Sequence, residues 1–133
     1  MQTYLDFQMK DDVLIVNIVG DLDHHRATQA REEIDKTIEV FKSKNLIMDF
    51  SKVEFMDSSG IGVVMGRYNK VKEKGGEIVI IGCSKYVKLI LEMAGIFTIM
   101  TYYDSLDEAL GAFQLTDQQI KMEMKMEVSG NGK

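Results

Sequence analysis

The sequence predicts a single α/β domain, with a mixed, largely parallel sheet, an opening hairpin and about four helices packed on the sheet. The 133 residues match the usual size of one domain, and 45% hydrophobic with 28% charged residues is ordinary for a globular protein. Two apolar runs open the chain with a short polar turn between them, which indicates an antiparallel hairpin. Later runs of strand length alternate with segments of helical periodicity, and such alternation is typical of parallel strands.

The first third of the chain predicts the hairpin and a helix. Residues 4–9 alternate apolar and polar as a half-exposed strand does, residues 11–12 mark a turn, and residues 13–19 form an apolar run typical of an interior strand. Asp23 is a natural N-cap for the helix that follows. The face of this helix that we expect to cover the sheet consists of Ala27, Ala30, Ile34, Ile38 and Phe41.

The central stretch, residues 46–76, predicts a strand that leads through a short turn into a helix. Residues 46–50 are an apolar run, and residues 57–60 form the turn. Gly75 and Gly76 end a helical pattern made by Ile61, Val64, Met65, Tyr68 and Val71. Basic residues in its later turns are expected to complement the negative end of the helix dipole; they are Arg67, Lys70, Lys72 and Lys74.

The remainder of the domain continues the alternation. Residues 77–82 read as a β-branched strand, and Ser84 can cap a helix that Gly95 closes. Residues 96–102 predict one more short strand, and Ser105 begins a last helix with the spacing of a capping box. The expected order is β-β-α-β-α-β-α-β-α.

Composition limits the class of protein. We assign residues 1–116 to the domain and residues 117–133 to a C-terminal extension that we expect to be frayed or disordered. A net charge of −5 argues against a direct nucleic-acid binder, and the single cysteine permits no internal disulfide. The sequence shows neither a signal-peptide pattern nor an apolar run of about 18 residues, so we expect a cytoplasmic protein with no membrane segment.

Ser58 and Ser59 stand at the start of the central helix. A hydroxyl at this position commonly accepts a hydrogen bond from an unpaired backbone N–H, and capping alone would explain both serines. The same position also favours a functional interpretation, because the positive end of a helix tolerates a phosphate at the surface. Phosphorylation would confront a docked partner with about −1.5 to −2 added charges.

Three glycines, Gly60, Gly62 and Gly66, occupy the first half of this helix although each costs about 1 kcal/mol relative to alanine. Close packing against a neighbouring element and a surface onto which a partner's helix fits explain them equally well. A dinucleotide fingerprint is a third alternative, but the spacing holds one residue too many.

His24 and His25 raise the alternatives of a metal site or a small serine hydrolase that would use Ser58 or Ser59. Adjacent helical residues point about 100° apart, so the two rings do not readily serve one metal. The G-x-S-x-G motif of many serine hydrolases is also absent around both serines. We therefore predict no catalytic residue and no metal, and expect the two histidines to be solvated.

Three segments carry a resemblance to a known family: GDLDHH at residues 20–25, FMDSSGIGVVMGRY at residues 55–68 and GGEIVI at residues 75–80. On these segments the chain resembles the anti-sigma factor antagonists, the STAS domain family, over about residues 3–114. Asp21 stands where the family usually has Glu. The tail has no recognised counterpart.

The resemblance implies a non-enzymatic switch. The unphosphorylated protein would bind an anti-sigma factor serine kinase and release a sigma factor, with sporulation sigma-F expected here. The kinase would phosphorylate Ser58, using its own ATP and no cofactor of this chain, and a PP2C-type phosphatase would reverse the modification. The expected partner-binding residues are Asp21, Asp23, His24, Asp57, Ser59, Gly60, Ile61 and Gly62. A STAS module that senses a nucleotide or lipid remains an alternative.

Overall fold

The computed structural model describes residues 4–114, whose strands form one mixed sheet. The five strands lie side by side in chain order: β1 (Tyr4–Lys10), β2 (Val13–Leu22), β3 (Asn45–Met56), β4 (Ile78–Ile81) and β5 (Thr101–Tyr103). β1 pairs antiparallel with β2, and all other neighbours are parallel. The predicted hairpin and largely parallel sheet are confirmed, although β3 is longer than the apolar run at residues 46–50 indicated.

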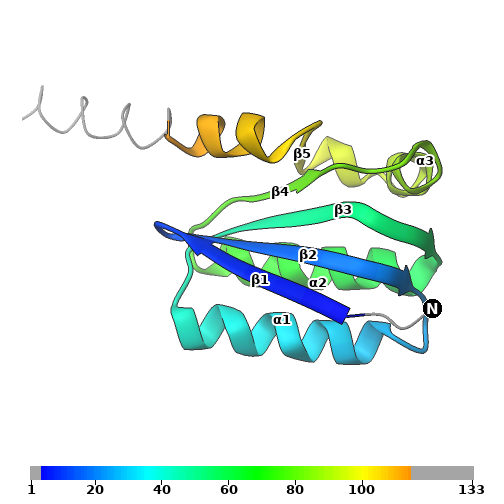
Figure 1. Ribbon diagram of the computed structural model, residues 1–133, viewed down its shortest axis with the longest axis horizontal. Coiled ribbons are helices and arrows are strands. Elements are labelled where there is room, and N and C mark those ends of the chain that lie inside the picture. Colours follow the sequence, from blue (N-terminus) through cyan, green and yellow to red (C-terminus); the bar gives the residue numbers. More distant parts are fainter. Residues whose placement is uncertain (1–3, 115–133) are drawn as a thin grey trace, which may run out of the picture.

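The helices cover the two faces of the sheet unequally (Figure 1). On one face, α1 (Ala27–Phe41), α2 (Ser58–Glu73) and α3 (Lys85–Met93) bury the main core. A last helix, over residues 106–114, packs with a smaller cluster on the opposite face. β2 supplies both cores through its alternation: Leu14, Val16 and Ile18 point to the main core, and Val13 and Ile15 to the smaller one.

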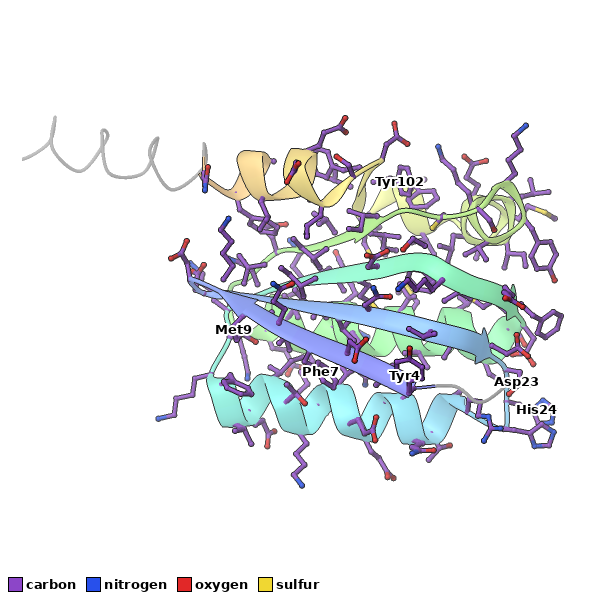
Figure 2. The ribbon with its side chains drawn as sticks, viewed as in Figure 1. Tyr4, Phe7, Met9, Asp23, His24 and Tyr102 are labelled. Atoms are coloured by element: carbon purple, nitrogen blue, oxygen red, sulfur yellow. The ribbon has the colours of Figure 1, made fainter. Side chains whose placement is uncertain are left out.

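The described residues begin and end at opposite ends of the sheet. Tyr4 pairs with Val19, so the described chain enters beside the end of β2. Phe113 and Gln114 lie beside the turn at residues 10–13, at the opposite end. Figure 2 shows the same arrangement, with Asp23 and His24 at the Tyr4 end of β1 and Met9 towards the other end.

Three expectations about local structure are wrong. Phe41, expected on the buried face of α1, is 57% exposed because it lies at the last position of the helix. Residues 96–102 do not form one strand: a 3-10 turn (Ile96–Thr98) precedes β5. Asp23 does not cap the first turn of α1, which begins four residues later; its role is described below.

Arg67 is also placed differently from the sequence-based expectation. It is only 4% exposed, and its Nε lies 2.8 Å from Oδ1 of Asp35 on α1. The two groups form a close ion pair between the two helices. Burial lowers the pKa of the Arg67 guanidinium and the Asp35 charge opposes that change. Arg67 thus joins α1 to α2 instead of serving the helix dipole from the surface.

Removal of the Asp35 carboxylate should destabilise the domain, because it leaves a buried guanidinium without its counter-charge. We expect Asp35→Ala to lower the free energy of unfolding by about 2 kcal/mol, measured by urea denaturation. Glu39→Ala is the matched control, since Glu39 pairs with Lys70 on the same two helices but is 66% exposed. The control should cost less than about 1 kcal/mol. Equal decreases in the free energy of unfolding for the two variants would show that the ion pair with the buried Arg67 contributes no more than an exposed pair.

Candidate functional site

The predicted switch residues lie where the parallel strands β2 and β3 end. Leu22 pairs with Met56 at the last position of each strand. The Asp57 N–H, which follows directly, donates to the Leu22 carbonyl at 3.4 Å. α2 begins at the next residue, so Ser58 stands at the carboxyl edge of the sheet, the usual location of functional groups in parallel sheets (Figure 1).

Asp57, rather than either serine, is the N-cap of α2. Its Oδ1 accepts the Ser59 N–H at 2.8 Å, while its Oδ2 accepts the His24 N–H at 3.2 Å and lies 3.4 Å from His24 Nδ1. One carboxylate therefore joins the start of α2 to the loop that follows β2. The prediction that Ser58 and Ser59 cap the helix is therefore wrong. The contact between Asp57 and His24 was not predicted from the sequence.

The pKa of Asp57 reflects these contacts. Partial burial raises the pKa, but hydrogen bonds from the backbone N–H groups of Ser59 and His24, helped by their side chains, outweigh it and bring the pKa below the ordinary value of 3.8. The carboxylate is therefore fully ionised at neutral pH. Ser58 has a permanent negative charge as its neighbour.

Asp23 organises the loop between β2 and α1. Its Oδ1 accepts the N–H groups of His25 at 3.0 Å and Arg26 at 3.2 Å, and its carbonyl accepts those of Arg26 and Ala27. Asp23 thus closes a turn before the helix, as aspartate commonly does. This turn holds His24 against Asp57.

The two histidines are exposed, as expected, and their ring centroids lie 4.0 Å apart. No hydrogen bond among residues 4–114 joins either ring to the hydroxyl of Ser58 or Ser59, and the only carboxylate contact of His24 in this range is with Asp57. The geometry does not assemble a nucleophile and base. Within the described residues no group of three or more His, Cys, Asp or Glu side chains is arranged to hold a metal ion.

Ser58 is exposed in the first turn of α2, whereas Ser59 is partly buried. Ile61 is also partly buried and packs against the main core, so only part of its side chain is available at the surface. Asp21 precedes Leu22 in β2 and is partly exposed. The structure therefore joins His24 to Asp57 by hydrogen bonds, with Asp23 closing the turn that carries His24, beside an exposed Ser58.

The glycines of α2 divide into two kinds. A Cβ on Gly60 would overlap the Met56 side chain and come within 3.1 Å of the Leu22 carbonyl oxygen, so Gly60 allows the helix start to approach the strand ends. At Gly62 and Gly66 a Cβ would meet nothing within 4 Å. Close internal packing thus explains Gly60 but not the other two, which leave bare backbone at the surface.

A family model described as the STAS domain matches residues 4–109. The chain belongs to the STAS domain family. Among curated relatives, the anti-sigma F factor antagonist of Paenibacillus polymyxa is 36% identical, in a match that covers 83% of this chain and 94% of the relative. The predicted resemblance of this STAS domain to the anti-sigma factor antagonists is confirmed.

Solved structures show the same fold. The anti-sigma factor antagonist SpoIIAA in its unphosphorylated form superposes with a TM-score of 0.67 at 24% identity, and covers 84% of this chain and 98% of its own. The Bacillus cell fate determinant SpoIIAA in the phosphorylated form gives 0.66 at 25% identity, with coverages of 83% and 99%. This STAS domain is thus equally similar to the two forms.

A methyl group on the two kinds of glycine should have opposite effects on stability. Gly60→Ala should lower the free energy of unfolding by about 1 to 3 kcal/mol through overpacking against Met56. Gly66→Ala adds helix propensity without a clash and should raise it by up to about 1 kcal/mol. Thermal unfolding followed by circular dichroism distinguishes the two, and a stabilising Gly60→Ala would show that the close approach is unimportant.

The Asp57 cap should stabilise the domain in a pH-dependent way. Asp57→Ala should cost about 1 to 2 kcal/mol at neutral pH. Because the folded-state pKa of Asp57 is below its unfolded value, this contribution is complete above about pH 4 and is lost as the pH falls through the folded pKa. Urea titrations of both proteins from pH 7 to pH 2.5 should therefore converge at low pH. Glu32→Ala, an exposed carboxylate on α1, is the control and should show no comparable difference.

Proposed function

We propose that this STAS domain is an anti-anti-sigma factor whose unphosphorylated form binds an anti-sigma factor serine kinase and so releases a sigma factor. Phosphorylation of Ser58 by that kinase would switch binding off, and a PP2C-type phosphatase would restore it. The observation that carries the proposal is the exposed Ser58 hydroxyl directly after the ionised cap Asp57. The Paenibacillus relative, named for antagonism of the anti-sigma F factor, favours sigma-F as the released factor.

Charge, rather than refolding, is the proposed mechanism of the switch. The hydrogen bonds that fix the start of α2 are made by Asp57 and not by the Ser58 hydroxyl, so esterification of Ser58 breaks none of them. The equal similarity to the phosphorylated and unphosphorylated SpoIIAA structures supports an unchanged fold. A phosphate would add about −1.5 to −2 charges beside Asp57 and near Asp23. A partner that approaches this surface would then have to desolvate a dianion among carboxylates, which disfavours binding.

The partner surface that we propose consists of Ser58 and the residues around it. Asp23 and His24 present the adjoining loop, and the bare backbone at Gly62 allows an approaching helix to come close. Asp21, Asp57, Ser59, Gly60 and Ile61 complete the proposed surface as its flank or its support. The kinase would supply ATP, and this chain would need no cofactor of its own.

A regulatory role also agrees with the chemistry that the described side chains offer. Burial raises the pKa of the Cys83 thiol to about 12, so it stays protonated and is a poor nucleophile. The serines lack a bonded base, as described above. No helix among residues 4–114 is long and apolar enough to span a bilayer, and a cytoplasmic location is part of the proposal.

Variants at Ser58 test the proposal directly. Ser58→Ala should bind purified anti-sigma F kinase in the presence of ATP and stay bound, whereas Ser58→Asp should bind at least about tenfold more weakly in calorimetry. Ser59→Ala is the matched control and should keep the switch. After incubation with kinase and ATP, mass spectrometry should find a phosphoryl group on Ser58 in the unmodified chain and in Ser59→Ala. Equal affinity of the two Ser58 variants, or phosphate on Ser59 instead, would refute the proposal.

A further inference from the structure

Four exposed apolar side chains form a surface that the proposed switch does not use. Phe55 is 44% exposed, Tyr86 47%, Leu89 54% and Met93 80%. The rings of Phe55 and Tyr86 are stacked, with centroids 6.3 Å apart and an interplanar angle of 25°. We call these four residues the α3 patch.

The α3 patch gives one short helix two apolar sides. Val87 and Leu91 are fully buried in the main core and account for the inner side of α3. Tyr86, Leu89 and Met93 recur at spacings of three and four residues, which places them along one outer stripe. A helix that only covers a sheet would carry polar residues there, and clustered exposed apolar residues mark interaction sites.

The patch adjoins the switch. Phe55 lies three residues before Ser58, in the part of β3 that leads into α2. Because Tyr86 stacks on Phe55, the first turn of α3 lies beside the same end of β3 (Figure 1). A typical interface covers about 800 Å² on each partner, so a protein that reaches Ser58 would also extend over neighbouring side chains of this size.

We propose that the α3 patch is a second, phosphorylation-independent half of the kinase interface and binds an apolar surface of the anti-sigma factor kinase. This inference rests on the proposed function and deepens it. Burial of apolar side chains stabilises a complex in proportion to the area removed from water and does not depend on the charge at Ser58. The Ser58 surface would decide whether the complex is tight, and the α3 patch would contribute the same factor of affinity in both states.

Such a division also fits the needs of a chain that is both the binding partner and the substrate of its kinase. The kinase has to hold the chain while the Ser58 hydroxyl remains accessible for phosphoryl transfer. An apolar contact beside Ser58, rather than over it, supplies affinity without covering the hydroxyl. Affinity lost on phosphorylation would then come from the Ser58 side alone.

The test combines the patch with the switch. Leu89→Gln/Met93→Gln removes apolar surface and keeps helix propensity. This double substitution is made in the full chain carrying either Ser58→Ala or Ser58→Asp, and calorimetry measures affinity for purified anti-sigma F kinase. We expect a loss of about tenfold or more in both backgrounds, by the same factor within about twofold. Val40→Gln/Phe41→Gln is the matched control, since these residues are 65% and 57% exposed at the far end of α1, and its affinity should not change.

The outcomes separate this inference from the proposed function. If the patch variant binds normally, or if the control loses as much affinity, the patch is not part of the interface. A loss in only one Ser58 background would refute its independence from phosphorylation. If the unmodified chain dimerises in sedimentation experiments and the patch variant does not, the occupant is a second copy and the inference is wrong. Equal affinity of the two Ser58 variants would instead refute the switch, whatever the patch does.

Discussion

The Asp57 carboxylate is the contact on which the arrangement of the site depends. It caps the N-terminus of α2 by accepting the Ser59 N–H, and it holds the loop after β2 by accepting the His24 N–H. Two segments far apart in sequence are therefore bound to the same carboxylate. Parallel strands bring the two segments to the same edge, where this carboxylate, the Asp57 N–H bond to the Leu22 carbonyl and the close approach at Gly60 hold them in contact. A single aspartate thereby fixes the position of the β2–α1 loop relative to the start of α2.

This arrangement would allow the proposed phosphorylation of Ser58 to leave the contacts at the start of α2 intact. Helix N-termini attract anions because their N–H groups lack partners, and a phosphate would ordinarily compete for those groups. Here Asp57 already occupies the Ser59 N–H, and Ser58 stands outside the hydrogen-bonded unit. New charge at Ser58 is therefore available to affect a partner more than the domain itself. The ion pair between the buried Arg67 and Asp35 joins α2 to α1, so two linked helices support the surface.

The elements with strong periodicity were predictable from sequence, and the contacts between them were not. The alternation in β1, the apolar run of β2 and the helical spacing in α2 indicated the opening hairpin and the position of Ser58 at a helix start. The 3-10 turn at Ile96–Thr98 was not predicted, because a short apolar run does not distinguish a strand from a tight turn. Arg67 carried no sequence signal of burial, since its counter-charge comes from another helix. Asp57 could have been identified as the cap, because aspartate is among the preferred N-cap residues and directly precedes the serines. The hydrogen bond from His24 to Asp57 could not have been predicted, because the two residues lie far apart in the sequence.

The hairpin register has a practical consequence for how this domain tolerates attachments. The described residues begin beside the end of β2, close to Ser58, and end beside the hairpin turn, a full strand length away. A fluorophore or fusion partner placed directly before Tyr4 would crowd the proposed partner surface. One attached directly after Gln114 would begin at the opposite pole of the described domain, away from that surface.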